Sequence, residues 1–150
     1  MTADSPQLHK LLPDPAATER LAAEVASVAR PGDAILLSGP LGAGKTAFAR
    51  AFLREASGDP NLEVPSPTFT LVQSYATRLG MVHHFDLWRL SGPADLAELG
   101  WDSAREGVIL VEWPDRLGHL SPPEALNVTL YSTGETSRVA ELRGWKERLR

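Results

Sequence analysis

The 150-residue sequence predicts a single α/β domain in which helices flank a mixed, largely parallel β-sheet. Three observations lead to this fold class. A short apolar run at 34–38 is followed by a glycine-rich segment at 39–44 and then by a helical pattern that begins at Lys45. Further strand-like runs come after this unit. The length is sufficient for one hydrophobic core but not for two domains of ordinary size.

The composition is that of an ordinary globular protein, with 43% hydrophobic and 23% charged residues. The 15 Lys and Arg against 19 Asp and Glu give a net charge of −4, which argues against nucleic-acid binding by clustered positive charge. The absence of Cys excludes disulfides, thiolate metal sites and a thiol nucleophile. No apolar run is long enough to cross a membrane and the first residues do not resemble a signal peptide, so we expect a cytoplasmic protein.

Residues 1–13 hold two prolines and little periodicity, and we expect them to form an N-terminal arm. Asp14-Pro15 is typical of a helix start, and the apolar pattern that follows continues to about Ala29. The run 34–38 predicts a strand that is buried on both faces of the sheet. The pattern at 45–56 predicts an amphipathic helix that is ended by a glycine and a proline.

The second half of the chain alternates between strand-like runs and short connections. We expect strands at 69–75, 81–86, 108–111, 126–131 and 137–142, a short helix at 93–99, and a short basic helix at the C-terminus. The chain contains no internal repeat and no linker that would divide it.

The strongest motif matches the phosphate-loop pattern G-x-x-x-x-G-K-[ST] without a gap, and it reads Gly39-Pro40-Leu41-Gly42-Ala43-Gly44-Lys45-Thr46. The glycines let successive backbone N–H groups converge on an anion, and the helix that begins there adds its positive dipole end. In this pattern the lysine contacts phosphate and the threonine hydroxyl binds Mg²⁺. The segment therefore predicts a Mg²⁺–nucleotide site, and the alternative is a flexible turn that binds nothing.

Two carboxylates follow strand-like runs, and such a site needs an acidic residue at the end of a neighbouring strand. Asp86 ends the run 81–86, and Glu112 follows the apolar run 108–111. Either can hold Mg²⁺ directly or through a water, or can position the attacking water, and the alternative for both is a solvated strand end. Because ligands lie at the carboxyl ends of parallel strands, we expect both carboxylates near the phosphate loop.

The loop at 64–69 has prolines on both sides of Ser66, and this stiffness favours a fixed position of the Ser66 and Thr68 hydroxyls near a γ-phosphate. The alternative is a loop that proline stiffens for stability alone. Three further residues are weaker candidates for the site when each is taken alone: His84 for orienting a phosphate or a water, Arg89 for neutralising transition-state charge, and Trp113 for contacting a nucleotide edge or a partner surface.

Taken together, four segments resemble the bacterial TsaE (YjeE) family: the phosphate loop, Ser66-Pro67-Thr68-Phe69, His84-Phe85-Asp86-Leu87-Trp88-Arg89-Leu90 and Val111-Glu112-Trp113-Pro114. The resemblance runs in order from about residue 14 to about residue 142. It implies a P-loop NTPase fold and an ATPase of the machinery that makes threonylcarbamoyladenosine at position 37 of tRNAs reading codons that start with A. It also implies TsaB and TsaD as protein partners, with tRNA contacted only through the complex.

The resemblance assigns a role to individual residues. Lys45 becomes the phosphate lysine, Thr46 and Glu112 become Mg²⁺ ligands, and Asp86 becomes a further metal-site or catalytic carboxylate.

Four residues outside the loop are then expected near the nucleotide: Thr68, Trp113, Pro15 and Gly134, the last two beside the adenine. Trp88 stands where the family usually has tyrosine, which puts in doubt any role that needs that hydroxyl.

These inferences favour hydrolysis of ATP to ADP and phosphate, at a low rate until partner subunits complete the site. One alternative is a small-molecule kinase that uses the same loop. This kinase would need an acceptor pocket and a lid, and the segment 90–106 has room for only a short helical excursion. A second alternative is a nucleotide-sensing interaction module without enzymatic activity.

Overall fold

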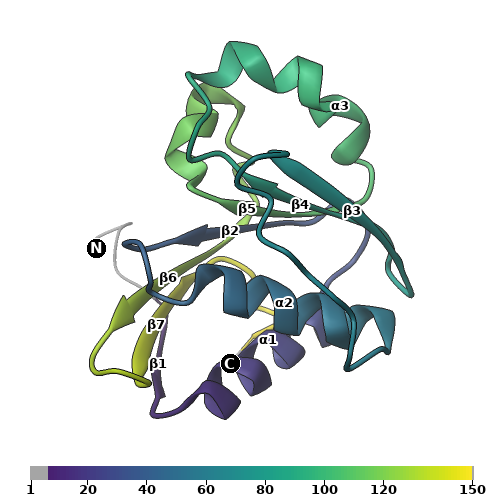
Figure 1. The fold of residues 1–150 in the computed structure, drawn as a ribbon. Coiled ribbons are helices and arrows are strands. Elements are labelled where there is room, and N and C mark those ends of the chain that lie inside the picture. The colour runs from purple at the N-terminus through teal and green to yellow at the C-terminus, as the bar shows by residue number, and fades with distance from the viewer. Residues whose placement is uncertain (1–6, 150) are drawn as a thin grey trace.

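The computed structural model describes residues 7–149, which form three layers, with a seven-stranded sheet between two groups of helices (Figure 1). The elements in chain order are β1 (Leu8–Leu12), α1 (Pro15–Val28), β2 (Ala34–Ser38), α2 (Lys45–Ser57), β3 (Val72–Thr77), β4 (Gly80–Asp86), the 3-10 helix η1 (Pro93–Leu99), α3 (Trp101–Ala104), β5 (Val108–Glu112), the 3-10 helix η2 (Pro114–Leu120), β6 (Leu126–Ser132) and β7 (Arg138–Arg143). The predicted α/β fold class is confirmed.

The strand order is β1-β7-β6-β2-β5-β4-β3. The four central strands, β6, β2, β5 and β4, are parallel to one another, whereas β7, β1 and β3 add to the two sides by antiparallel pairing. The carboxyl ends of the central strands therefore meet at one edge of the sheet. Loops that follow these strands are brought together there, which is where ligands bind in such folds.

Both faces of the central strands are covered by apolar side chains. Along β2, Ile35 and Leu37 pack into the core cluster under α1 and α2, while Ala34 and Leu36 pack into a second cluster on the opposite face. That second cluster is closed by the short helices, and it includes the buried Trp101. This alternation explains why β2 reads as a continuous apolar run, as predicted.

Helices α1 and α2 lie side by side on one face of the sheet (Figure 1). Helix α1 begins as predicted, because the Asp14 side chain accepts a hydrogen bond of 2.9 Å from the Ala17 N–H. Helix α2 begins directly at the end of the glycine-rich loop after β2. No helix within residues 7–149 is long and apolar enough to span a bilayer.

The prediction of an N-terminal arm over residues 1–13 is wrong for residues 8–12, which form strand β1 and pair with β7. Leu8 packs against the core and Leu12 is buried within it, but Lys10 occupies the inward position between them. This lysine interrupts the apolar alternation by which a strand is recognised. The rest of the predicted arm, residues 1–6, lies outside the described residues.

Two other boundaries differ from the sequence prediction. The strand expected at 69–75 begins only at Val72, because Leu71 adopts a left-handed backbone conformation and its N–H donates to the Pro67 carbonyl. The expected basic helix at the C-terminus is instead a turn. Arg148 in this turn forms an ion pair with Asp33 and so ties the end of the chain to the start of β2.

The cap at Asp14 makes a quantitative prediction for stability. Asp14→Ala removes the acceptor of the Ala17 N–H and is expected to lower the free energy of unfolding by about 1 kcal/mol. Asp14→Asn keeps an acceptor at this position and should change it by only a few tenths. Urea denaturation of both variants measures the two values, and an equal loss in both would contradict the capping role.

Candidate nucleotide-binding site

Residues 39–44 form a loop that leaves the carboxyl end of β2 and leads into α2. Lys45, the first residue of α2, is only 5% exposed and turns back over this loop. Its ammonium group donates to the carbonyl oxygens of Gly39 at 2.6 Å and Pro40 at 3.0 Å, and it lies 4.1 Å from the centre of the Trp113 ring. The structure thus brings together the loop, its lysine and Trp113, as the sequence predicts.

Burial lowers the pKa of Lys45 from its ordinary value, while the carboxylates of Glu112 and Asp86 act in the opposite direction. Desolvation is the larger effect because the ammonium group is removed from water. Its present partners are two carbonyl dipoles and an aromatic face, which compensate the charge only in part. A phosphate group placed at the loop would restore a full counter-charge to this cation.

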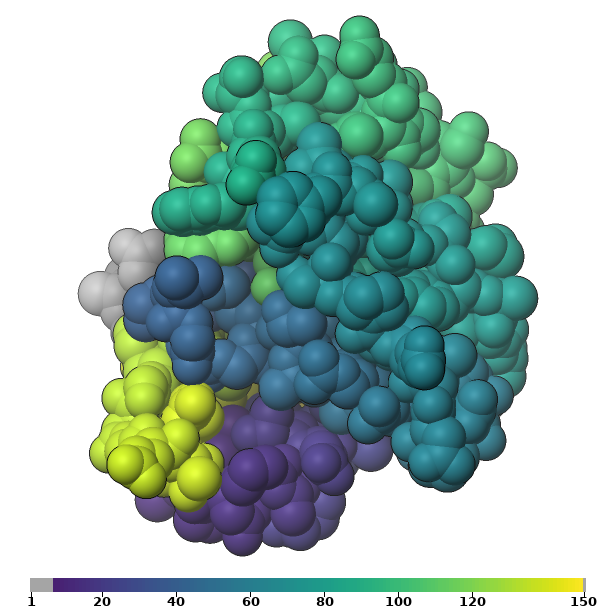
Figure 2. Space-filling model, in the orientation of Figure 1, coloured from purple at the N-terminus to yellow at the C-terminus, as the bar shows by residue number. Residues whose placement is uncertain are grey.

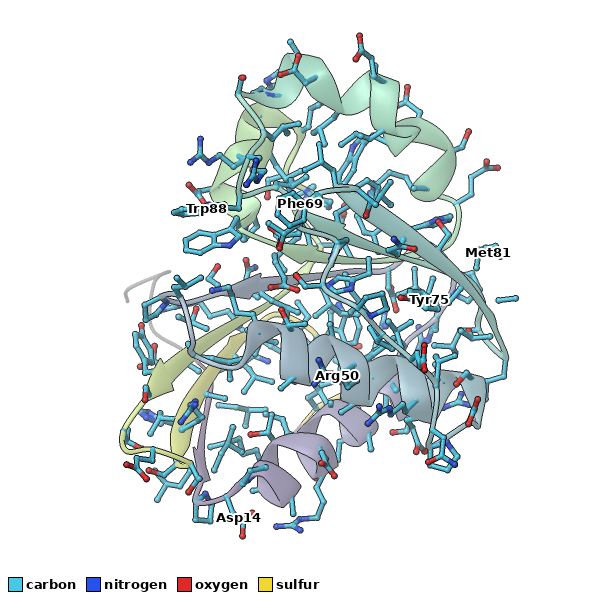
Figure 3. All side chains as sticks on the ribbon, viewed as in Figure 1. Asp14, Arg50, Phe69, Tyr75, Met81 and Trp88 are labelled. Carbon is cyan, nitrogen blue, oxygen red and sulfur yellow. The ribbon has the colours of Figure 1, made fainter. Side chains whose placement is uncertain are left out.

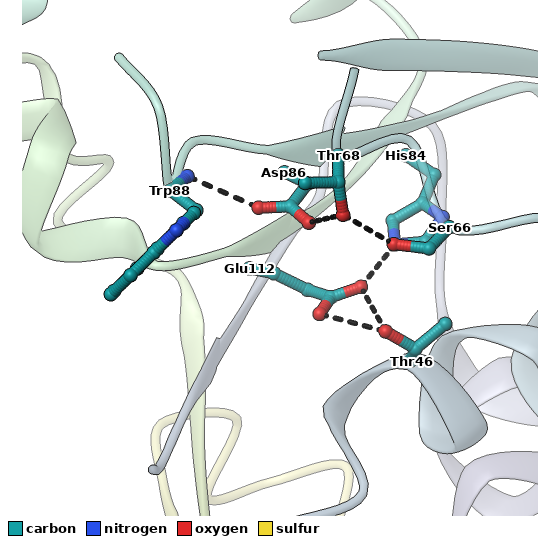
Figure 4. A network of polar contacts seen from close by, with 7 residues as sticks. All are labelled: Thr46, Ser66, Thr68, His84, Asp86, Trp88 and Glu112. Carbon is teal, nitrogen blue, oxygen red and sulfur yellow. Dashed lines mark hydrogen bonds and ion pairs between the residues drawn. The ribbon is translucent and has the colours of Figure 1, made fainter. Parts of the chain in front are cut away.

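Glu112 ends β5 and makes the central polar contacts of the site (Figure 4). Its carboxylate accepts hydrogen bonds from the Thr46 hydroxyl, at 3.0 and 3.1 Å, and from His84 Nε2 at 2.7 Å. His84 is fully buried on β4, so the carboxylate is fixed from two neighbouring elements. A hydroxyl and a carboxylate oxygen in contact form a donor set that suits Mg²⁺.

No cluster of three or more His, Cys, Asp or Glu side chains that could cage a metal ion occurs within residues 7–149. Mg²⁺ is usually bound in proteins by one or two carboxylates together with substrate phosphates, not by a complete protein cage. Thr46 and Glu112 therefore fit a metal ion that arrives with a phosphate-bearing ligand.

Asp86 lies beside Glu112, because the two residues pair in register across β4 and β5. Its carboxylate accepts hydrogen bonds from the Thr68 hydroxyl at 3.0 Å and from the main-chain N–H of Trp88 at 3.1 Å. The Ser66 and Thr68 hydroxyls are 2.8 Å apart, and since Thr68 donates to Asp86, Ser66 donates to Thr68. The proline-containing loop is thereby attached to the end of β4 (Figure 4).

Large apolar side chains are exposed around the loop. Leu41 at the loop tip is 83% exposed, and Phe69 is 81% exposed. Phe69 and Trp88 lie near each other on one face of the molecule (Figure 3). The Arg89 guanidinium lies 4.6 Å above the Phe69 ring, and the Trp88 ring contacts Trp113 at 4.5 Å. Trp88 thus serves as an aromatic contact at a position where the resemblance expects tyrosine.

A cavity of about 730 Å³ lies between α1, α2 and the turn that joins β6 to β7. Its wall includes Pro15 at the start of α1, Gly44 at the end of the loop, and Thr136 in the turn. Gly134 belongs to the same turn but does not itself line the cavity, whereas Glu135 and Thr136 of this turn do. Such a volume is typical of small-molecule sites, and this cavity adjoins the phosphate loop at Gly44.

The role of one residue in this region was not predicted from the sequence. Arg138, the first residue of β7, lines the cavity and donates hydrogen bonds to carbonyl oxygens of the phosphate loop. No local motif marks it, since its role depends on the pairing of β7 with β6.

Comparison with known proteins identifies the family. The family model of the threonylcarbamoyl adenosine biosynthesis protein TsaE matches residues 12–140. The chain belongs to the TsaE family. All four motifs on which the resemblance rests lie within the matched range.

Among its relatives, a tRNA threonylcarbamoyladenosine biosynthesis protein TsaE of Rickettsia felis is 39% identical over 126 residues, which cover 83% of this chain and 73% of the relative. A protein of the same name from Bacillus subtilis is 35% identical over 83% of this chain and 78% of its own length. The crystal structure of Bacillus subtilis YdiB superposes with a TM-score of 0.74 and 29% identity, over 94% of this chain and 87% of that one. The predicted family is confirmed, whereas the roles of single residues stay predictions.

Two glycines of the loop provide a matched test of its geometry. A Cβ at Gly39 would lie 2.3 Å from the Leu130 carbonyl oxygen of β6, with φ at +139°, whereas a Cβ at Gly42 would meet nothing within 4 Å, with φ at +82°. Gly39→Ala is expected to lower the free energy of unfolding by roughly 3 kcal/mol, since backbone strain and a steric clash add. Gly42→Ala carries the strain alone, roughly 1 kcal/mol. Equal losses in a denaturant titration would show that the close approach to β6 is unimportant.

Proposed function

We propose that this TsaE family member is a Mg²⁺-dependent ATPase that hydrolyses ATP to ADP and phosphate in the biosynthesis of tRNA threonylcarbamoyladenosine. The contact between the Thr46 hydroxyl and the Glu112 carboxylate carries the proposal. It joins the first turn of α2 to the end of β5 beside the buried ammonium group of Lys45. Family membership and the names of the relatives support the pathway.

In this proposal Lys45 exchanges the carbonyl oxygens of Gly39 and Pro40 for phosphate oxygens. The loop N–H groups and the N-terminal end of α2 bind the same phosphates. Thr46 and Glu112 would hold Mg²⁺, and the ion would supply positive charge that offsets the negative charge developing on the phosphate oxygens. The protein thus lowers the barrier by position and electrostatics, without a covalent step of its own.

Asp86 is the better candidate for positioning the attacking water. In this proposal Glu112 is committed to Thr46 and the metal ion, and one of its oxygens also accepts from His84. The two oxygens of Asp86 each accept one hydrogen bond, from the Thr68 hydroxyl and from the Trp88 N–H. Asp86 is linked through Thr68 and Ser66 to the proline-containing loop, which is expected to lie near the γ-phosphate. A water held between Asp86 and this loop would be oriented for in-line attack on the γ-phosphate.

The kinase alternative receives less support from the packing of the segment between β4 and β5. A lid must be free to open and close over the substrate. In this segment Leu96 on η1 and Trp101 on α3 are buried in the core cluster of the opposite sheet face. The segment therefore contributes to the core instead of covering the phosphate loop.

We further propose that TsaB and TsaD are the partners, that tRNA is reached only through their complex, and that the protein acts in the cytoplasm. The exposed apolar side chains of Leu41, Phe69 and Trp88 around the loop support a protein partner at this face. The net charge of −4 argues against direct, independent binding of tRNA.

Glu112→Gln separates hydrolysis from binding. The substitution keeps the shape but removes the charge that holds Mg²⁺, so ATP hydrolysis is expected to fall about 100-fold or more while nucleotide binding is retained. Single-turnover hydrolysis and equilibrium dialysis of ATP measure the two quantities. A nucleotide-sensing module without catalysis predicts unchanged basal turnover in this variant.

The partner proposal is tested by ATP hydrolysis with this chain alone and with purified TsaB and TsaD, each with and without Mg²⁺. We expect slow Mg²⁺-dependent turnover that rises at least tenfold when both partners are present, because they would exclude water from the open side of the site. Full activity of the isolated chain would contradict the proposal. Stimulation by a small metabolite in place of the proteins would favour the kinase.

A further inference from the structure

Arg138 lies between two parts of the molecule that form the cavity next to the phosphate loop. One part is the loop itself, and the other is the turn 133–137 between β6 and β7. Figure 2 shows the yellow-green turn and the blue loop next to each other on one face, with α1 in purple below. These two segments are about 95 residues apart in the sequence, and the Arg138 side chain bonds to both.

The guanidinium group of Arg138 donates hydrogen bonds to both segments. Its Nε donates to the Ala43 carbonyl at 3.0 Å and Nη2 to the Gly42 carbonyl at 3.3 Å. On the other side, Nη1 donates to the carbonyl oxygens of Ser137 at 2.8 Å, Gly134 at 3.1 Å and Glu135 at 3.4 Å. A single planar cation therefore fixes five backbone carbonyl groups.

The bonds to the loop bear on phosphate binding because the peptide group is planar and trans. Its N–H and C=O point in opposite directions, so a carbonyl held on one side directs the following N–H to the other side. Arg138 holds the Ala43 carbonyl from the cavity side and thereby fixes the direction of the Gly44 N–H. An anion site built from backbone N–H groups binds tightly only when these directions are set in advance.

Arginine suits this position better than lysine does. Its guanidinium stays protonated at any physiological pH and presents five donors in a rigid fork, whereas lysine offers one compact ammonium. A lysine at 138 would reach one set of carbonyl groups, but its single charge centre could not span both the loop and the turn.

We propose that Arg138 is a positioning residue that holds the phosphate loop and the turn 133–137 in one fixed arrangement. The phosphate side of the cavity, at the loop, and the base side, at the turn where the adenine is expected, are then organised together. The proposal rests on the proposed function, because it assumes that the loop binds nucleotide phosphates. It concerns binding of the nucleotide, and it assigns Arg138 no contact with the reacting atoms.

The first test is calorimetric titration of the full chain with Mg²⁺-ADP and with inorganic tripolyphosphate, which has no base or ribose. In Arg138→Gln both affinities are expected to fall about tenfold, since the loop loses two charge-assisted bonds. Arg138→Lys should recover only part of the loss. If tripolyphosphate binding is unchanged while ADP binding weakens, Arg138 contacts only the base side and the proposal is overturned; unchanged binding of both ligands overturns it as well.

Arg148→Gln is the matched control. Arg148 also bonds to a backbone carbonyl, that of Val28, and to the Asp33 carboxylate, but at the opposite edge of the sheet. This variant is expected to lower the melting temperature and to leave both affinities within twofold of the unsubstituted chain. An equal loss of affinity in Arg148→Gln would mean that general destabilisation explains the result.

A second measurement keeps the proposal separate from the proposed function. Amide hydrogen exchange of the nucleotide-free chain is expected to accelerate at 41–46 and at 133–137 in Arg138→Gln, and to stay unchanged in the central strands. If the unsubstituted chain binds neither ligand, the proposed function fails, and the exchange data still decide whether Arg138 holds both segments. Unchanged exchange at both segments overturns the proposal.

Discussion

The carboxylate of Glu112 is buried where three elements meet, and it satisfies its charge by accepting hydrogen bonds from Thr46 on α2 and His84 on β4. An unpaired buried carboxylate is costly, so the position of this group constrains everything around it. The parallel register of β4 and β5 must place His84 within reach, and that same register sets Asp86 beside Glu112. The start of α2 must lie against the end of β5, which fixes where the phosphate loop emerges.

The phosphate loop depends in turn on contacts from outside its own sequence. Its carbonyl groups are held by Lys45 at one end, through Gly39 and Pro40, and by Arg138 at the other, through Gly42 and Ala43. The Pro40 and Ala43 carbonyls are bonded to these cations, so the N–H groups that follow them, of Leu41 and Gly44, point away from the cations and can face an anion. The other two peptide groups offer no such donor, since Pro40 has no N–H and the Ala43 N–H donates to the Pro40 carbonyl. The two cations differ in one respect. In the proposed function Lys45 would exchange its carbonyl partners for a phosphate, whereas Arg138 would keep its partners and so maintain the shape of the loop.

The parts of this structure that the sequence predicts are those specified by neighbouring residues. The phosphate loop, α1, α2 and the buried strands follow from local spacing and caps, and the carboxyl-end rule for parallel strands places Asp86 and Glu112 correctly. Features that depend on distant pairing were missed. Strand β1 forms because it pairs with the free edge of β7, which comes far later in the chain, and Lys10 interrupts the apolar alternation of β1. The same strand β7 carries Arg138 to the loop.

In the proposed function, the combination of a fixed interior and an open rim gives a physical reason for efficient hydrolysis to require a partner. Glu112, Asp86 and Lys45 are almost fully buried and held by short hydrogen bonds, so their arrangement requires little reorganisation. Leu41 and Phe69, by contrast, stand in solvent at the sides of the loop. Electrostatic stabilisation of a transferred phosphoryl group is strongest where water is excluded. A protein surface that covers these two side chains would bury apolar area and exclude water from the site at the same time. Partner binding would then be coupled to catalysis without any rearrangement of the buried carboxylates.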